Sequence, residues 1–396
     1  MLTGKKIVLG VSGGIAAYKM ANVASMLVKL HADVHVVMTE NATHFITPET
    51  FEALTANRCY TDTFDRSMEM HVPHVTLGTT ADAILIAPAS ADVLGKIAHG
   101  IADDMLTTTV LPATCPVMLA PSMNVHMYEN KIVQDNMRRL ADFGYEIIEA
   151  DEGYLACRAI GKGKLPPEGL LVEYIVRACA KEKDLAGKKV LVTAGATQEA
   201  IDPVRYITNH STGKMGYAVA RMAMLRGADV TLVTGETSLP ELLFVNTINV
   251  HSAKEMYDAV TAISDKQDII IKAAAVADYR PVKVSDEKIK KSDSSMAIEL
   301  ERTDDILGYL GVHKRDGQFI CGFSMETENM LENSRKKLVN KNVDMIAANN
   351  LKQDGAGFGT DTNIMTLITA DAVIELPKMS KEEVADRILD QIVAKL

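Results

Sequence analysis

The chain has 396 residues, more than one hydrophobic core usually supports, so we expect two domains. Hydrophobic residues make up 47% of it, yet no apolar run reaches the length of a membrane span and no basic and apolar leader precedes Gly4, which predicts a soluble, cytoplasmic protein without a membrane partner. The net charge of -10 argues against nonspecific binding to nucleic acid, and five scattered cysteines without a CxxC pair argue against a disulfide framework or a zinc site.

The chain opens twice in the same way. The sequence Gly-Lys-Lys-Ile-Val-Leu that begins at Gly4 returns as Gly-Lys-Lys-Val-Leu-Val from Gly187. Each copy predicts a short buried strand, Ile7–Gly10 or Val190–Thr193, followed by a turn of small residues and a helix. Such a turn presents unpaired N–H groups and the positive end of a helix dipole to an anion. The signal is weak by itself, because tight packing in an α/β sheet produces the same pattern.

Apolar runs of strand length alternate with helical patterns along the whole chain. This alternation predicts an α/β protein of two doubly wound, Rossmann-like domains in series. The charged segment 178–184 predicts a linker between a domain of residues 1–180 and one of residues 187–396. Ser380 is the expected N-cap of a closing helix that includes residues 381–389. The predicted strands are Ile7–Gly10, Val34–Met38, Ala83–Ala87, Val117–Ala120, Val190–Thr193, Val230–Thr234, Ile269–Lys272 and Met345–Ala348.

Four clusters in the first half each follow a predicted strand or open a helix. They are Ser12-Gly13-Gly14, residues 74–77 (HVTL), residues 88–92 (PASAD) and residues 121–127 (PSMNVHM). Because the carboxyl ends of parallel strands share one edge of the sheet, these clusters are expected to line a common crevice. They lack the full GxGxxG fingerprint and a well-placed ribose-binding acid after the second strand, which favours a mononucleotide over a dinucleotide.

In this order the clusters, together with Ala156-Cys157-x-x-x-Gly161-x-Gly163, resemble the flavin-dependent cysteine decarboxylases, in particular the phosphopantothenoylcysteine decarboxylases. The resemblance implies a flavodoxin-like domain with bound FMN. It also implies a reaction in which the cysteinyl carbon and sulfur are oxidised, CO2 is lost and the electrons are returned, so that nothing is oxidised overall. The FMN-binding residues that it implies are Ser12, Gly13, Gly14, Thr39 and Ser90.

The same resemblance implies three catalytic residues. His74 would be the base or electrostatic partner of the oxidation, Asn124 would donate an amide N–H to the substrate carboxylate, and Cys157 would protonate the ene-thiolate product. A free thiol has a pKa of about 8.5 and still holds its proton at neutral pH. From the residues alone, each has a plainer interpretation: a loop histidine, a helix cap and a small buried hydrophobe. Asp92 stands where asparagine is commoner in the family, and its role stays open.

The second half contains a polar loop and a strand exit that carry many cations. Residues 202–216 read DPVRYITNHSTGKMG, and a loop this rich in arginine, asparagine, hydroxyl groups and lysine indicates anion binding. Residues 273–280 read AAAVADYR, and the lysines of 287–291 follow; these would face a triphosphate or, as for many lysine runs, only solvent. Lys337 and Lys341 share one face of a helical pattern, a spacing that also suits an exposed surface.

Together these segments resemble the phosphopantothenate-cysteine ligases, from Gly187 to the C-terminus. The resemblance implies that CTP, accompanied by Mg2+ with unknown ligands, activates a carboxylate as an acyl-cytidylate and that the amine of cysteine displaces CMP. Lys288 would stabilise charge on the α-phosphate, and Arg205 and Asn209 would hold the substrate's carboxyl end or the acyl intermediate. The nucleotide-binding residues that it implies are Ala274, Asp278, Asp305, Ile306, Leu307, Gly308, Phe323, Lys337 and Lys341.

The leading hypothesis is a bifunctional enzyme of coenzyme A biosynthesis whose ligase domain supplies its decarboxylase domain. 4'-Phosphopantothenate, L-cysteine and CTP would enter and 4'-phosphopantetheine would leave. The resemblance further implies a homo-oligomer, with trimeric decarboxylase domains, dimeric ligase domains and a dodecamer that would combine them. Two alternatives remain: a nicotinamide-dependent Rossmann oxidoreductase, suggested by the two openings, and a regulatory flavin-binding protein of the same fold.

Overall fold

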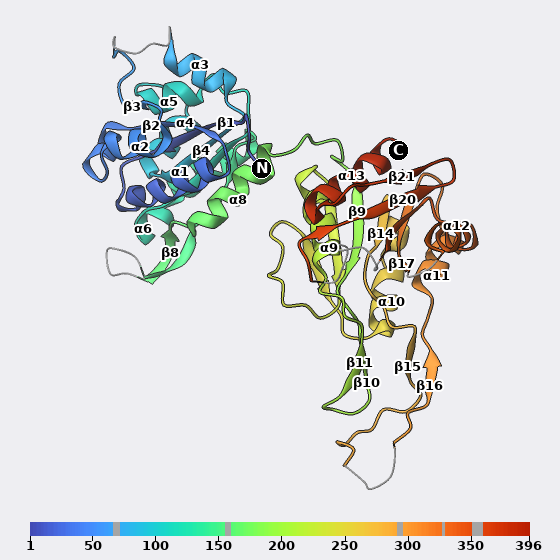
Figure 1. Ribbon diagram of the computed structural model, residues 1–396. Helices are drawn as coiled ribbons and strands as arrows, with labels where there is room; N and C mark the ends of the chain where they lie inside the picture. The colour runs from blue at the N-terminus through green and yellow to red at the C-terminus, as the bar shows by residue number, and fades with distance from the viewer. Residues whose placement is uncertain (66–71, 155–159, 291–295, 327–328, 351–358) are drawn as a thin grey trace. The chain divides into compact units, whose positions relative to one another are not determined.

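The chain folds into two compact units, Met1–Lys181 and Glu182–Leu396, and each unit has its own sheet with helices on both faces (Figure 1). The prediction of two α/β domains with a doubly wound architecture agrees with this arrangement. The computed structural model describes residues 1–65, 72–154, 160–290, 296–326, 329–350 and 359–396.

A parallel six-stranded sheet forms the first unit, in the order β3-β2-β1-β4-β5-β6. The strand order reverses between β1 and β4, which is the topological switch point at which ligands bind in open α/β sheets. The four strands predicted in this half are confirmed. The short β3 and β6 were not predicted, because two residues show no periodicity. The strands are β1 (Lys6–Val11), β2 (Asp33–Met38), β3 (Cys59–Tyr60), β4 (Ala83–Ala89), β5 (Val117–Pro121) and β6 (Glu146–Ile147).

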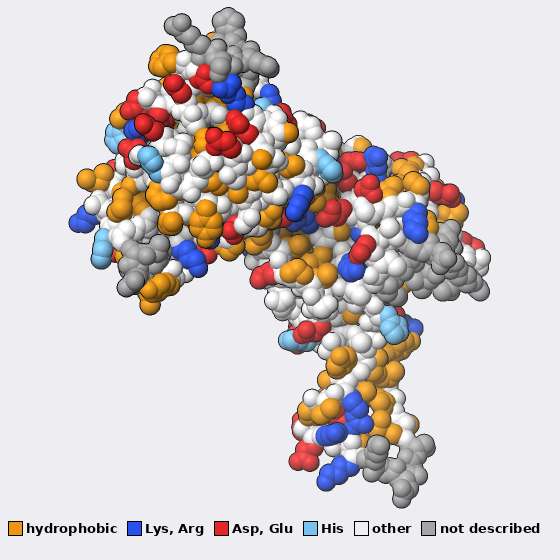
Figure 2. Space-filling model, turned by 60° about the vertical axis from the view of Figure 1, so that its left-hand side comes forward, with side chains coloured by type: hydrophobic (Ala, Val, Ile, Leu, Met, Phe, Trp, Pro, Cys, Tyr) orange, Lys and Arg blue, Asp and Glu red, His pale blue; other side chains and the backbone are white. Residues whose placement is uncertain are grey.

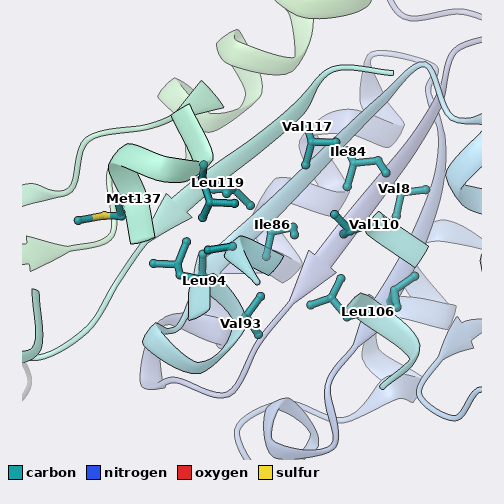
Figure 3. Close-up of a cluster of buried hydrophobic side chains, with 14 of the residues drawn as sticks. Val8, Ile84, Ile86, Val93, Leu94, Leu106, Val110, Val117, Leu119 and Met137 are labelled. Carbon is teal, nitrogen blue, oxygen red and sulfur yellow. The ribbon is translucent and has the colours of Figure 1, made fainter. Parts of the chain in front are cut away.

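Helices cover both faces of this sheet. On one face α1 packs with α8, and α3, α4, α5 and α7 cover the other. Figure 3 shows that second face, where Ile84 and Ile86 of β4 meet Leu94 and Leu106. Complete burial of a leucine side chain stabilises a fold by roughly 1.5–3 kcal/mol. The helices and the β7/β8 hairpin are η1 (Ile15–Lys19), α1 (Met20–Lys29), η2 (Glu40–His44), α2 (Pro48–Thr55), α3 (Pro73–Thr80), α4 (Ala91–Ala98), α5 (Met105–Val110), α6 (Val125–Tyr128), α7 (Lys131–Asp142), β7 (Asp151–Tyr154), β8 (Ile160–Lys164) and α8 (Glu168–Cys179).

The second unit contains a mixed eight-stranded sheet, in the order β13-β12-β9-β14-β17-β18-β20-β21. Strands β13 to β18 are parallel, but β20 and β21 are antiparallel, so the prediction of a parallel sheet is wrong at this edge. The connection from β20 to β21 is too short for the crossover that a parallel neighbour requires. The strands are β9 (Lys189–Ala194), β12 (Asp229–Thr234), β13 (Asn246–Asn249), β14 (Ile269–Lys272), β17 (Phe319–Glu326), β18 (Met345–Asn350), β20 (Met365–Thr369) and β21 (Val373–Glu375).

Helices α9 and α13 pack together on one face of this sheet, and α10, α11 and α12 lie on the other. Two hairpin-like pairs, β10/β11 and β15/β16, contact each other and extend from the sheet as an arm, whose described residues are 198–208, 279–290 and 296–302 (Figure 1). The remaining elements are β10 (Gln198–Ala200), β11 (Tyr206–Thr208), α9 (Lys214–Leu225), α10 (Ala253–Thr261), η3 (Ser264–Lys266), β15 (Tyr279–Pro281), β16 (Leu300–Arg302), α11 (Ile306–Val312), α12 (Met330–Asn340), β19 (Thr362–Asn363), β22 (Met379–Ser380) and α13 (Lys381–Val393).

The closing helix α13 begins where the sequence predicts. Ser380 is its N-cap: the Oγ atom accepts a hydrogen bond from Glu383 N at 3.2 Å, and Ser380 N donates to the Glu383 carboxylate at 2.8 Å. This reciprocal pair is a capping box, which satisfies two backbone donors that the first turn would otherwise leave unpaired.

Replacing this cap is expected to weaken the second unit. Ser380→Ala removes the acceptor and should lower the free energy of unfolding by about 1 kcal/mol, whereas Ser380→Asp keeps an acceptor and should change it little. Urea unfolding of the full chain, followed by hydrogen exchange of the α13 amides, measures the difference. Equal protection of α13 in both variants would contradict the role of the cap.

Candidate functional site

The first unit has a cavity of about 530 Å³ beside the switch point between β1 and β4. Four predicted site residues line it: Gly13, Gly14, Ser90 and Asn124. The chain needs glycine at position 13, because a Cβ atom there would lie 2.5 Å from the Cβ of Asn41. The loop after β1 therefore lies directly against the segment after β2, as a close backbone approach to a ligand requires.

Ser12 joins two loops of this cavity. Its buried hydroxyl donates to the carbonyl of Pro88 at 2.7 Å and accepts a hydrogen bond from Ser90 N at 2.9 Å. The predicted site residue therefore fixes the β1 loop against the β4 loop. Ser90 is in turn the N-cap of α4, where its Oγ accepts from Val93 N at 3.3 Å.

Thr39, the predicted residue at the end of β2, carries a hydroxyl that is buried without a hydrogen-bond partner among the described residues. The backbone N–H of Thr39 donates to the carbonyl of Val11 at 3.0 Å, so the residue is held beside the β1 loop. Because a buried polar atom without a partner costs about 1–3 kcal/mol, such an atom in a native protein calls for an explanation such as a ligand.

The three predicted catalytic residues of this half have different surroundings. His74 is in the first turn of α3, and its Nδ1 atom is buried without a partner within the described chain. Asn124 is the N-cap of the short helix α6, where Oδ1 accepts from His126 N at 2.9 Å. Its interpretation as a helix cap is therefore confirmed, and its catalytic role stays a prediction. Cys157 lies outside the described residues. Asp92, whose role the sequence leaves open, pairs with Lys96 at 3.4 Å.

In the second unit, threonine hydroxyls hold the loop after β14. Thr193 accepts a hydrogen bond from Ala274 N at 3.1 Å, and Thr197 accepts one from Ala277 N at 3.0 Å. From the polar loop, Asn209 donates its side-chain amide to the carbonyl of Ala275 at 3.2 Å. These bonds fix the backbone of the AAAVAD segment at the carboxyl edge of the sheet, next to the predicted Asn209.

Two cavities lie at this edge, of about 410 and about 390 Å³, and Asp278 belongs to the wall of both. We name them the lysine cavity and the loop cavity. The lysine cavity is lined by the predicted residues Asp278, Asp305, Ile306, Leu307, Lys337 and Lys341. The loop cavity is lined by the predicted residues Asn209, Ala274, Asp278 and Phe323, together with the polar loop at Ser211–Lys214.

The remaining nucleotide-binding prediction, Gly308, lies behind the lysine cavity rather than on its wall. Its N–H donates to the carboxylate of Asp305 at 2.9 Å, where Asp305 is the N-cap of α11. Lys341 also pairs with this carboxylate, and Lys337 donates to the carbonyl of Phe323 at 3.1 Å. Burial by itself raises the pKa of Asp305, but these donors outweigh it and lower the pKa overall, so the carboxylate stays charged.

The second small-residue turn, unlike the first, is closed by its own chain. Ala196 forms bridges to Glu236 and Ala275, and a Cβ atom at Gly235 would lie 2.2 Å from the carbonyl oxygen of Ala196. Neither Gly195 nor Ala196 lines the loop or lysine cavity. The expectation that a turn offers its backbone to a phosphate therefore stays a prediction for Gly13 and Gly14, which line a cavity, whereas in the second unit a neighbouring loop occupies the approach.

Arg205 and Lys288 lie on the arm rather than on either cavity wall. The Arg205 guanidinium contacts the Asp202 carboxylate at 3.0 and 2.5 Å and the carbonyl of Ile289 at 2.6 Å. Asp202 also accepts from Ile289 N at 3.1 Å, so one buried carboxylate joins the two strand pairs of the arm. Lys288 is exposed beside this junction, and Figure 2 shows Lys and Arg side chains gathered on the arm.

The pKa of Asp202 reflects this junction. Burial by itself raises the pKa, but the hydrogen bonds from Arg205 and from the backbone N–H groups of Val204, Ile289 and Arg205 outweigh it and hold the pKa well below the ordinary 3.8. The stabilisation is fully present above that ordinary value and is lost as the pH falls through the lower pKa of the folded state.

Three lysines of these cavities are absent from the predicted site residues, although Lys214 belongs to the polar loop that is expected to bind an anion. Lys272 ends β14 and lines the lysine cavity, and Lys214 and Lys381 line the loop cavity. Lys214 binds the carbonyl of Gly359 at 2.8 Å and pairs with Asp361 at 2.7 Å. The signal for Lys272 was a charged residue at the last position of an otherwise apolar buried strand, which predicts a side chain at the carboxyl edge. Lys381 was treated only as part of a closing helix.

Within the described ranges, no group of three or more His, Cys, Asp and Glu side chains could hold a metal ion. The expected Mg2+ ligands therefore stay unassigned there. No helix of the described chain is both long and apolar enough to cross a lipid bilayer.

Breaking the arm junction is expected to release the segment that carries Lys288. Asp202→Asn removes the charge that Arg205 contacts, so hydrogen exchange over residues 285–290 should become about tenfold faster at pH 7. Asp316→Asn, a change at an exposed loop position, is the matched control and should leave that exchange unchanged. The difference in exchange rate between wild type and Asp202→Asn should disappear as the pH falls below 3.8. Equal exchange in Asp202→Asn and Asp316→Asn at pH 7 would contradict the role of Asp202.

Comparison with known proteins identifies a family for each unit. The Flavoprotein family matches residues 1–180, and the family described as DNA/pantothenate metabolism flavoprotein C-terminal domain matches residues 185–396. The chain is 49% identical to the coenzyme A biosynthesis bifunctional protein CoaBC of Bacillus subtilis (strain 168), over 100% of this chain and 98% of that protein. It is 44% identical to the protein of the same name from Vibrio vulnificus (strain CMCP6), over 99% of this chain and 98% of that protein.

One solved structure covers about half of this chain. The crystal structure of a C-terminal domain of coenzyme A biosynthesis bifunctional protein CoaBC is 46% identical, with a TM-score of 0.47, over 54% of this chain and 98% of that chain. The full-length identities decide the matter of family, because they extend through both units. The chain belongs to the family of coenzyme A biosynthesis bifunctional proteins CoaBC, with an N-terminal flavoprotein domain and a C-terminal domain of the DNA/pantothenate metabolism flavoprotein type.

Proposed function

We propose that the second unit couples 4'-phosphopantothenate to L-cysteine with CTP and that the first unit decarboxylates the product, 4'-phosphopantothenoylcysteine, to 4'-phosphopantetheine with FMN. The observation that carries the proposal is the pair of cavities that share Asp278. Their walls include every nucleotide-binding residue expected from the sequence except Gly308, together with Asn209.

The residues of the first unit fit FMN. The cavity at the switch point, the close approach permitted by Gly13 and the buried Thr39 hydroxyl without a partner all suit a phosphorylated planar ligand. Gly13, Gly14 and Ser90 would hold it, and Ser12 would keep the two loops in place. Bound FMN would supply a two-electron sink and source, which makes decarboxylation at the cysteinyl carbon accessible.

Three side chains would act on the substrate of this unit. The buried Nδ1 of His74 lacks a partner in the described chain, so the imidazole suits the role of base or electrostatic partner. Asn124, on the cavity wall, would donate an amide N–H to the substrate carboxylate without neutralising its charge. Cys157 would be the acid that protonates the ene-thiolate product of decarboxylation.

In the second unit the substrate carboxylate would attack the α-phosphorus of CTP, and pyrophosphate would leave. The cysteine amine would then attack the acyl carbon, CMP would leave, and the nitrogen would lose a proton. Asn209 in the loop cavity would orient the carboxylate, and Arg205 would act by holding the arm through Asp202. Mg2+ would enter with the triphosphate and reduce its charge.

In this proposal Lys288 stabilises the charge that develops on the α-phosphate. Because Lys288 lies outside the walls of both cavities, the arm must bring it to the nucleotide, either over its own cavity or into that of a second copy in a dimer. A fixed ammonium at developing phosphate charge is an effective form of electrostatic catalysis. The proposal includes a homo-oligomer because the arm of one copy could bring Lys288 to the nucleotide of another.

A nicotinamide-dependent oxidoreductase is the second candidate. The two strand-and-turn openings suggest it, but no acid after the second strand of either sheet is well placed to bind a ribose. Glu40 and Glu236 come two residues after these strands, yet Glu236 pairs with His251 at 2.7 Å and neither glutamate lines one of the three cavities discussed above. Binding of NAD by a protein that retains no FMN would favour this candidate.

Complete turnover tests the proposal directly. Protein mixed with 4'-phosphopantothenate, L-cysteine, Mg2+ and CTP should yield 4'-phosphopantetheine by mass spectrometry, and samples without CTP should yield none. Accumulation of 4'-phosphopantothenoylcysteine would indicate a ligase with an inactive flavin domain. Retained FMN without any product would favour the regulatory flavin-binding protein.

Two substitutions should separate the activities. Lys288→Gln removes the ammonium and should reduce ligation by a factor of about 100 or more, while added 4'-phosphopantothenoylcysteine is still decarboxylated. Cys157→Ser should permit CO2 loss but block release of 4'-phosphopantetheine, with ligation unchanged. Normal 4'-phosphopantetheine output from the serine variant would refute the acid role, and loss of both activities in either variant would indicate misfolding.

Thr39→Val tests the FMN assignment, because valine has the shape of threonine without the hydroxyl. The Kd for FMN should rise about fivefold, while the thermal stability of the FMN-free protein should not fall, since the hydroxyl has no protein partner to lose. Thr43→Val, which removes an exposed hydroxyl that donates to Glu40 O at 2.7 Å, is the control and should leave the Kd unchanged. Flavin fluorescence titration measures both values.

A further inference from the structure

Lys272 occupies an unusual position for a lysine. It is the last residue of β14, a central strand that lies between β9 and β17, with Thr193 and Gly322 as its register neighbours. Ile270, two residues earlier on the same face, belongs to the hydrophobic core beneath α10, α11 and α12. The lysine therefore stands where this apolar face ends and the lysine cavity begins.

The surroundings of Lys272 direct its side chain to the cavity. A Cβ atom at the neighbouring Gly322 would lie 2.8 Å from Leu307, so Leu307 packs across the strand beside the lysine. Lys272 is half-buried and lines the lysine cavity with Leu307. No hydrogen bond or ion pair joins its ammonium to any other residue that the structure describes.

The charged groups around Lys272 come from every element that borders the cavity. Lys337 and Lys341 face it from the α12 end, Asp278 from the loop after β14, and Asp305 from the N-terminus of α11. Arg302 and Asp304 complete the charged part of the wall. Asp305 already pairs with Lys341, and Lys337 already donates to Phe323 O, whereas Lys272 has no such bond within the described ranges.

We propose that Lys272 is a nucleotide-binding residue of the lysine cavity, whose ammonium contacts an anionic group of the bound nucleotide. The inference rests on the proposed function, which places CTP at this sheet edge, and extends it to a residue outside the expected set. A cation without a partner, exposed only to a cavity rich in other cations, is suited to a polyanionic ligand.

The ligand-free cavity disfavours the charged form of this lysine. Burial, the like charge of Lys337 and, more weakly, that of Lys341 lower the pKa of Lys272 to about 8, against the opposing effect of Asp278 and Asp305. A polyanion reverses this balance, so Lys272 takes up a proton as the nucleotide binds. The uptake is about half a proton at pH 8 and approaches one at pH 9.

Titration calorimetry of the full chain with CTP and Mg2+, without the other substrates, tests the inference. Measurements in buffers of different ionisation enthalpy give the number of protons taken up. Wild type should take up about half a proton more at pH 8 than Lys272→Met, and little more at pH 6.5. At pH 7 the Kd for CTP should be about tenfold higher in Lys272→Met.

Two further variants keep the test specific. Lys272→Arg retains a permanent charge, so it should bind CTP more tightly than Lys272→Met without the additional proton uptake. Lys336→Met removes an exposed lysine of α12 that pairs with Glu332 at 2.7 Å, and should match wild type. In the absence of CTP, Lys272→Met should raise the melting temperature at pH 7, because it removes a charge that the ligand-free fold disfavours.

The outcomes separate the inference from the proposed function. Equal CTP affinity and equal proton uptake in wild type and Lys272→Met, with CTP-dependent ligation intact in wild type, would overturn the role of Lys272 alone. Failure of wild type to bind CTP or to ligate would overturn the proposed function and the inference with it. Hydrogen exchange of the β14 and β17 amides in each variant reports whether the second unit, which contains Lys272, is folded.

Discussion

The backbone that leaves a parallel strand at its carboxyl end must find new hydrogen-bond partners, and hydroxyl side chains provide them in both units. Ser12 links the β1 and β4 loops of the first unit, and Thr193 and Thr197 hold the loop after β14 in the second. These hydroxyls are fully buried. Because they satisfy backbone groups that water cannot reach, they permit irregular backbone beside the ligand cavities without a desolvation cost.

The two units meet this constraint differently, although they open with the same six-residue pattern. In the first, the loop after β1 itself forms the wall of the cavity. In the second, the corresponding turn bridges to neighbouring loops, and the cavities lie further along the edge, at β14 and β17. A repeated strand and turn therefore specifies the sheet, while contacts made by distant loops decide which part of its edge stays open to a ligand.

The sequence predicts the fold where the physics is local. Buried runs such as Ala83–Ala87 and Ile269–Lys272 identify central strands, and Ser380 with Glu383 identifies the start of α13. It does not predict β13, whose residues are mostly polar, or the antiparallel edge at β20, because edge pairing depends on partners far along the chain. Sequence motifs identify Asn209, Asp278 and Lys337 as candidate site residues. Lys272 becomes a candidate only when the structure shows that β14 ends at its position, beside the lysine cavity.

The Asp202 carboxylate joins the two segments of the arm through Arg205 and Ile289 N, and a backbone bond from Ser285 N to Ile201 O adds to this connection. The exposed Lys288 is therefore positioned by bonds within the arm and not by the sheet. Because a buried carboxylate without its guanidinium partner is costly, Asp202 and Arg205 are expected to change only as a pair. Sequence variation among relatives is thus expected to be closely correlated at these two positions.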